Sequence, residues 1–297
     1  MTRLLLLTLL GFALSCESKV QEENDTGQEQ STLTIIEEIW AKDKGLRNVE
    51  SVIYDEEHGV FYVSCGQNYE PGYAGFISKI SKSGELLQLS WVDSLSRPTG
   101  MAIEGQWLYV ADVNTLIVID TKTGQIVEKH TAPIRNAGLN DVAIDELGRV
   151  YISASFVNSI YWLNGDELEL WVQDDERLKW ANGLAVADNK LIVGGLDLYS
   201  IDLVSKEILA INMKPAAHDF DGLASDGKSG YWLTTVDNGA LWHLDHHGNN
   251  VVMDSTADYF GDLTVVNNQL IVPRGSHTTK EYYLSVFSIE SPKGSFP

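Results

Sequence analysis

Four residues with oxygen-bearing side chains occupy matching places in a sequence repeat: Glu50, Asn140, Asn182 and Asp221. Carboxylate and amide oxygens are hard donors that suit Ca²⁺ or Mg²⁺ better than a soft metal. Two carboxylates brought together without a cation would repel each other, and a divalent ion would neutralise both. If the fold gathers these positions, we expect a site for a divalent cation. Taken singly, such residues also begin strands for local reasons, because they satisfy nearby backbone groups.

The repeat consists of six short stretches spaced by 39 to 49 residues. Each has a polar or small residue second and a small or acidic residue third, followed by an apolar run. The second positions include Thr99 and Gly261 besides the four residues above. The stretches are VESVIYD (49–55), PTGMAIE (98–104), LNDVAID (139–145), ANGLAVA (181–187), FDGLASD (220–226) and FGDLTVV (260–266).

Each stretch is followed by a turn and a second strand pattern, and alternating apolar residues then continue through Gly-, Asn- and Asp-containing turns. This pattern is typical of β-hairpins, and the period matches one propeller blade. We therefore predict an all-β fold, a six-bladed β-propeller of four-stranded antiparallel blades over residues 32–297. The last blade lacks a fourth strand, and TLTIIEEIW (32–40) is the predicted strand that closes the ring. The first strands surround one axis in a propeller, so the six second positions should converge.

The octet GLASDGKS (222–229) matches the phosphate-binding pattern of nucleotide hydrolases. A phosphate loop must lead into a helix, whose N-terminal amides bind the phosphates. Here a strand pattern, YWLTTV, follows instead, and the other repeats have a turn at the same place. We interpret the octet as a hairpin turn.

The N-terminus has the features of a bacterial lipoprotein signal peptide over residues 1–15. Arg3 precedes an apolar run that is too short to span a bilayer, and Ser15 then precedes Cys16. Cys16 is the predicted lipidation site; the alternative is an ordinary secretory peptide cleaved nearby. Residues 16–31 are polar and acidic and are predicted to form a disordered tether. Lipidation of Cys16 would leave Cys65 without a disulfide partner, as a buried core thiol.

The formal net charge is −21, from 42 acidic and 21 basic residues. Such a charge repels phosphate backbones and anionic lipid surfaces, so nucleic acid is not an expected partner. We expect contact with a membrane only through the lipid anchor, in the cell envelope, with the outer membrane favoured because Glu17 follows the cysteine. The expected partner is a small-molecule substrate or ligand, and the expected state is a monomer.

At blade level the domain resembles the gluconolactonase and senescence-marker-protein (regucalcin-like) propellers. The residues that carry the resemblance are Glu50, Asn140-Asp141, Asn182-Gly183 and Asp221-Gly222. The resemblance implies that Glu50, Asn182 and Asp221 hold the metal, most simply Ca²⁺, with Mg²⁺ or another divalent ion as alternatives. It also implies that Asn140 contacts the substrate and that Asp221 is the catalytic carboxylate.

The implied activity is metal-dependent hydrolysis of a lactone, ester or related small molecule, in which Asp221 activates water or attacks directly. The sequence departs from the family at Gly138, where such lactonases often have an arginine that holds substrate oxygen. Arg135 and Arg274 are possible substitutes. The alternative function is a non-catalytic propeller that binds a ligand or protein and uses the metal only for structure.

Overall fold

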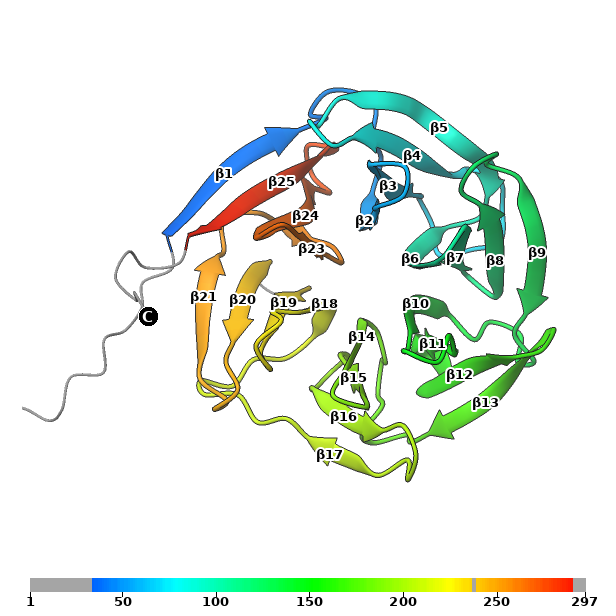
Figure 1. The fold of residues 1–297 in the computed structure, drawn as a ribbon, viewed down its shortest axis with the longest axis vertical. Coiled ribbons are helices and arrows are strands. Elements are labelled where there is room, and N and C mark those ends of the chain that lie inside the picture. Colours follow the sequence, from blue (N-terminus) through cyan, green and yellow to red (C-terminus); the bar gives the residue numbers. More distant parts are fainter. Residues whose placement is uncertain (1–33, 237–238, 291–297) are drawn as a thin grey trace, which may run out of the picture. The chain divides into compact units, whose positions relative to one another are not determined.

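Six antiparallel sheets surround a common axis in the computed structural model, which describes residues 34–236 and 239–290 (Figure 1). The predicted signal peptide and the whole predicted tether, which includes Cys16, lie outside the described residues. Five sheets follow the chain order from the axis outward, as consecutive hairpins predict. No helix among the described residues is long and apolar enough to cross a membrane.

In the first three blades the strands follow one another from the axis outward. Blade 1 contains β2 (Val49–Asp55), β3 (Val60–Cys65), β4 (Gly75–Ser81) and β5 (Leu86–Leu95). Blade 2 contains β6 (Pro98–Glu104), β7 (Trp107–Asp112), β8 (Thr115–Asp120) and β9 (Ile126–Thr131). Blade 3 contains β10 (Leu139–Ile144), β11 (Val150–Ala154), a 3₁₀ turn (Ser155–Val157), β12 (Ser159–Asn164) and β13 (Glu167–Gln173).

Blades 4 and 5 have the same order, and blade 6 is completed from both ends of the domain. Blade 4 contains β14 (Leu184–Ala187), β15 (Lys190–Val193), β16 (Tyr199–Asp202) and β17 (Ile208–Ala210). Blade 5 contains β18 (Phe220–Ser225), β19 (Tyr231–Thr235), β20 (Ala240–Leu244) and β21 (Asn250–Asp254). Blade 6 contains β22 (Tyr259–Phe260), β23 (Thr264–Val266), β24 (Gln269–Ser276), β25 (Glu281–Glu290) and β1 (Thr34–Trp40).

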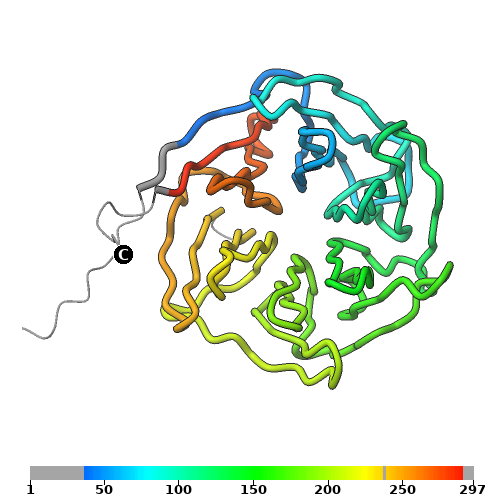
Figure 2. The backbone as a smooth tube through the Cα atoms, in the orientation of Figure 1, coloured from blue at the N-terminus to red at the C-terminus, as the bar shows by residue number. Residues whose placement is uncertain are grey.

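The predicted ring closure is confirmed. β1 pairs antiparallel with β25 from Thr34–Glu290 to Trp40–Leu284, so the first described strand is the outermost strand of the last blade (Figure 2). Each of six apolar clusters joins the facing sides of two consecutive blades; one, for example, contains Val63 of blade 1 and Val286 of blade 6. Cys65 is fully buried in that cluster, and burial raises the pKa of its thiol to about 11.

The octet at 222–229 is a hairpin turn, as predicted. β18 ends at Ser225 and β19 begins at Tyr231. The Asp226 carboxylate accepts the backbone N–H groups of Lys228 (2.7 Å) and Gly230 (2.8 Å), which is how a short acidic side chain stabilises a turn.

Arg274 on β24 holds the closure of the ring. Its Nη1 donates to Oε1 of Glu37 on β1 at 2.6 Å and to Oδ2 of Asp254 on β21 at 2.9 Å. The arginine is 3 % exposed, so one buried cation links the closing strand to the preceding blade. Arg274 is therefore unavailable to substitute for a substrate-binding arginine.

We expect Arg274→Met to lower the free energy of unfolding by about 3 kcal/mol, because it leaves two carboxylates without their shared cation. Urea unfolding followed by circular dichroism measures the change. The control is Arg177→Met, which breaks an ion pair with Asp174 on the exposed surface and should leave the unfolding midpoint unchanged. Equal midpoints for the two variants would contradict the role of Arg274.

Candidate functional site

Four of the six predicted inner positions lie at β-bulges. Four inner strands shift register against the second strand of their blade, and Glu50, Thr99, Asn140 and Asp221 are the first residues inside these bulges. A bulge bends its strand and redirects a side chain. We call the six second positions of the repeat the inner ring.

A hydroxyl from the second strand satisfies the backbone N–H that a bulge releases. In three blades the acceptor is the second-last residue of that strand. The sequence therefore has a serine or threonine at this position of the repeat. The bonds run from Ser51 N–H to Ser64 Oγ (2.9 Å), from Asp141 N–H to Ser153 Oγ (2.8 Å) and from Gly222 N–H to Thr234 Oγ1 (2.7 Å).

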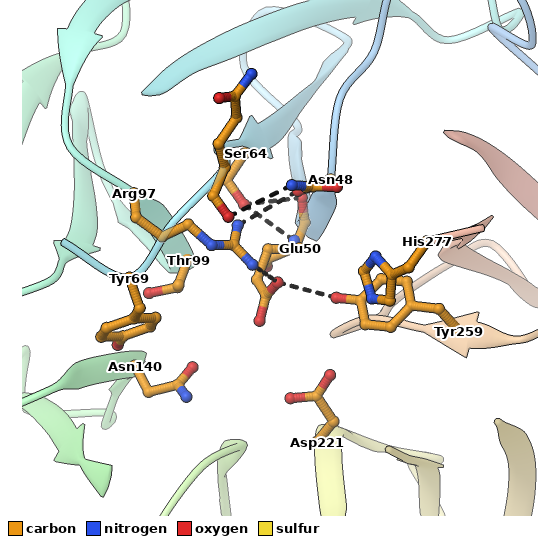
Figure 3. A network of polar contacts seen from close by, with 12 residues as sticks. Asn48, Glu50, Ser64, Tyr69, Arg97, Thr99, Asn140, Asp221, Tyr259 and His277 are labelled. Atoms are coloured by element: carbon orange, nitrogen blue, oxygen red, sulfur yellow. Dashed lines mark hydrogen bonds and ion pairs between the residues drawn. The ribbon is translucent and has the colours of Figure 1, made fainter. Parts of the chain in front are cut away.

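Glu50 is bound by two residues that the sequence reasoning missed. Its Oε2 accepts Arg97 Nη2 at 2.5 Å and the Tyr259 hydroxyl at 2.9 Å (Figure 3). Arg97 precedes β6 of blade 2 and Tyr259 is in β22 of blade 6, so three blades meet at one carboxylate. Burial lowers the pKa of Arg97, but the charge of Glu50, its hydrogen bond to the guanidinium and the neighbouring tyrosines together raise it by more, so the guanidinium stays charged.

Asp221 is paired with the other predicted ligand, Asn182. The Asn182 Nδ2 donates to Asp221 Oδ1 at 2.7 Å, and Asp221 is 4 % exposed. Burial raises the pKa of Asp221 well above its usual range, and the charges of Glu50 and Asp262 raise it further. A carboxyl group in this position has a strong affinity for a proton or another cation.

Asn140 is held by a chain of hydrogen bonds between blades 3 and 4. Its Nδ2 donates to Ser155 Oγ at 3.2 Å, and Ser155 Oγ donates to the carbonyl of Ala181 at 2.7 Å. Ser155 therefore positions Asn140 and also connects it with the backbone next to Asn182.

The other two inner-ring positions supply no ligand to the axis. Thr99 is fully buried and donates its hydroxyl to the carbonyl of Ala111 in its own blade. At Gly261 a Cβ would lie 2.3 Å from the Glu50 carbonyl oxygen, so the close approach of blades 6 and 1 requires glycine.

Two further carboxylates, Asp141 and Asp262, occupy the third positions of the repeat. Asp141 Oδ2 accepts the N–H of Leu184 from the next blade at 2.6 Å, and Asp262 Oδ2 accepts Ser51 Oγ from blade 1 at 2.8 Å. Burial raises the pKa of Asp262 to about 7 and that of Asp141 well above its usual range. Both groups therefore join one blade to the next.

Arg97 is placed by the residues around it. Its backbone N–H and that of Ser96 donate to the Asp112 carboxylate, at 2.6 and 2.9 Å, and its Nη1 donates to the Asn48 carbonyl at 3.3 Å. A Cβ at Gly66 would lie 2.6 Å from Arg97 Cδ, so glycine makes room for the side chain. The only sequence signal was its place two residues before Thr99.

Two histidines, His277 and His218, and the candidate Arg135 lie at different distances from the site. His277 is close to it: its ring centroid is 5.0 Å from that of Tyr259, and its Nδ1 pairs with the Tyr282 hydroxyl at 2.9 Å. His218 is exposed and pairs with Asp197, and Arg135 is exposed in the loop before β10.

The chemistry of the inner ring fits a hard divalent cation. Across the described residues no hydrogen bond reaches Oε1 of Glu50 or Oδ2 of Asp221, and burial, followed by the charges of Glu50 and Asp262, raises the pKa of Asp221. Asn182 presents its amide nitrogen to Asp221, and a half-turn of the amide would present its oxygen instead. Residues 34–236 and 239–290 contain no group of three or more His, Cys, Asp or Glu side chains placed for a metal.

Solved structures confirm the resemblance at the level of the fold. A gluconolactonase from Xanthomonas campestris is 16% identical, with a TM-score of 0.66 over 82% of this chain and 87% of that one. A calcium-binding protein, regucalcin, from Agrobacterium tumefaciens is 14% identical, with a TM-score of 0.65 over 85% and 93%. Virginiamycin B lyase from Staphylococcus aureus is 10% identical, with a TM-score of 0.60 over 86% and 100%. No family model and no curated protein matches the sequence.

Proposed function

We propose that the protein is a hydrolase of a small lactone or ester that depends on a divalent cation, most simply Ca²⁺. The observation that carries the proposal is Asp221, a buried carboxyl group with a raised pKa beside a second carboxylate, Glu50. One of the Asp221 oxygens accepts no hydrogen bond from the part of the chain that the structure describes. Glu50, Asn182 and Asp221 would hold the cation. When bound, it polarises the carbonyl or phosphoryl oxygen of the substrate.

The chain's own residues divide the remaining work. Asp221 accepts the proton of the attacking water, because its Oδ2 accepts no hydrogen bond among the described residues while Asn182 holds its Oδ1. The alternative is that the Asp221 carboxylate itself attacks the substrate as a nucleophile. Arg97 and Tyr259 fix Glu50 in one orientation, and Asn140, held by Ser155, orients the substrate.

The second candidate is a non-catalytic binding propeller with a structural cation. It is favoured by Gly138, where a substrate-binding arginine was expected and no side chain stands. The two functions differ in turnover but share the inner ring, so cation binding alone does not separate them.

The deciding experiment is a hydrolysis screen of the purified protein with five- and six-membered lactones and aryl esters, in EDTA and after addition of Ca²⁺, Mg²⁺ or Mn²⁺. We expect turnover that EDTA abolishes and one of the ions restores. Calorimetry in parallel measures cation binding. A protein that binds the cation and hydrolyses none of the substrates would have the second function.

The predicted setting belongs to the same proposal. The chain would be lipid-anchored through Cys16 in the bacterial cell envelope, at the outer membrane rather than the inner one, and would act there as a monomer on a small molecule. The apolar run and the Ser15-Cys16 junction support the anchor.

A further inference from the structure

An aromatic ring covers the position where the arginine is missing. Gly138 has a φ of +68°, and a Cβ there would lie 2.7 Å from the ring of Phe156. Any side chain at 138 would therefore displace Phe156, which stands on the 3₁₀ turn of blade 3. At this place the wall of the site therefore has an apolar ring, and position 138 has no positively charged side chain.

Phe156 belongs to an arc of three aromatic side chains from three different blades. Its ring centroid lies 5.2 Å from that of Tyr69 and 6.1 Å from that of Trp180, the latter pair edge to face. Phe156 and Trp180 are 49 % and 53 % exposed, which is unusual for large apolar side chains that already touch each other. We call Tyr69, Phe156 and Trp180 the aromatic arc.

The backbone holds Trp180 in an unfavourable conformation. Its φ is +57°, in the left-handed region, which costs a bulky residue about 1 kcal/mol. The side chain of Asn158 accepts the Trp180 N–H at 3.1 Å. Strain of this kind persists where the surrounding structure imposes it, often at ligand sites.

The arc is continuous with the inner ring. The Tyr69 hydroxyl donates to the carbonyl of Leu139, the neighbour of Asn140, while Ser155 next to Phe156 binds Asn140 directly. Trp180 and the inner-ring residue Asn182 line one pocket of about 330 Å³, whose other walls are Gly195, Asp219, Phe220 and Val236. A molecule held at Asn182 therefore has aromatic and aliphatic walls beside it.

We propose that the arc and this pocket bind an aryl group of the substrate, so that the enzyme selects aryl-bearing lactones or esters over polyhydroxylated sugar lactones. This inference rests on the proposed hydrolase function. Edge-to-face contacts with Phe156 and Trp180 would stabilise a bound aryl ring. Burial of its apolar area would add about 25 cal/mol per Å² to the binding free energy. The hydroxyl groups of a sugar lactone that face Phe156, Trp180 and Val236 would lose water without regaining hydrogen bonds.

The kinetic test compares dihydrocoumarin, δ-valerolactone and glucono-1,5-lactone as substrates. We expect the highest kcat/KM for dihydrocoumarin. Phe156→Ala and Trp180→Ala should each lower that value about tenfold and change the value for δ-valerolactone less than threefold, with the Kd for Ca²⁺ unchanged. The control is Leu147→Ala, which removes an exposed side chain at the turn between β10 and β11, at the other end of the inner strand.

A binding test separates this inference from the hydrolase function. Calorimetry measures the Kd of the lactams 3,4-dihydro-2-quinolinone and δ-valerolactam, which resemble the two lactones and resist hydrolysis. Tighter binding of the aryl lactam that is lost in both arc variants supports the inference even if no substrate turns over. Equal Kd values for the two lactams, or hydrolysis that the arc variants leave unchanged for dihydrocoumarin, would overturn it while the hydrolase function could stand.

Discussion

Asp221→Asn should abolish turnover, with a loss in kcat of at least about 10³, and should stabilise the protein in EDTA. An amide cannot accept the proton of the attacking water, and it offers the cation no negative charge. The same change removes a buried charge that Glu50 and Asp262 repel, so the free energy of unfolding without metal should rise. Activity with saturating Ca²⁺ and urea unfolding in EDTA measure the two effects.

Asp226→Asn is the matched control, in the turn at the other end of the same strand. Burial raises the pKa of Asp226, but hydrogen bonds from His243 and two backbone N–H groups lower it by more, so its charged form is favoured in the fold. The control should therefore lose stability at neutral pH and keep its activity, the reverse of Asp221→Asn. If Asp221→Asn kept more than a tenth of the wild-type kcat, that result would contradict the proposed role of Asp221 as the base.

Arg97→Met should have opposite effects on stability and on cation affinity. Removal of the guanidinium leaves Glu50 and Asp221 without their shared counter-charge, so we expect unfolding in EDTA to cost about 3 kcal/mol less. Arg97 also repels a cation bound by Glu50, so the variant should bind Ca²⁺ at least about tenfold more tightly. Calcium should consequently restore most of the lost stability through linkage.

Calorimetric titration with Ca²⁺, together with urea unfolding in EDTA and in excess Ca²⁺, tests both signs. Arg97→Lys keeps the charge but loses the planar fork, and should fall between Arg97→Met and the wild type in both measurements. An unchanged Ca²⁺ affinity in Arg97→Met would mean that no cation binds beside Glu50. That result would exclude Glu50, Asn182 and Asp221 as the ligand set, while the description of the fold would still hold.

Much of the fold was predictable because its determinants are local. Alternating apolar residues and Gly- or Asp-containing turns specify hairpins within some 40 residues, and the same pattern occurs six times. The closing strand was predictable because residues 32–40 formed a strand pattern that belonged to no blade, and the last blade lacked its fourth strand. The structure confirms both, with β1 beside β25.

The candidate site was predictable only where its members share a repeat position. Glu50, Asn140 and Asp221 stand at equivalent bulges, so the register of the repeat brings them to one axis. Arg97 and Tyr259 stand outside those positions, and no spacing in the chain indicates that both bind Glu50. Arg274, a candidate for the missing arginine, instead joins β1 to β21.

The sequence by itself thus determined the six blades, their order and the polar residues that begin the inner strands, since hairpin formation depends on neighbouring residues. Only the tertiary structure decided which charged side chains contact each other and which side chains form the wall of the site. Arg97 reaches Glu50 because ring closure sets the rotation of one blade against the next, whereas Phe156 covers Gly138 because the two residues flank the paired strands β10 and β11 of one blade. That rotation follows from the packing of all six interfaces at once, which no local pattern encodes.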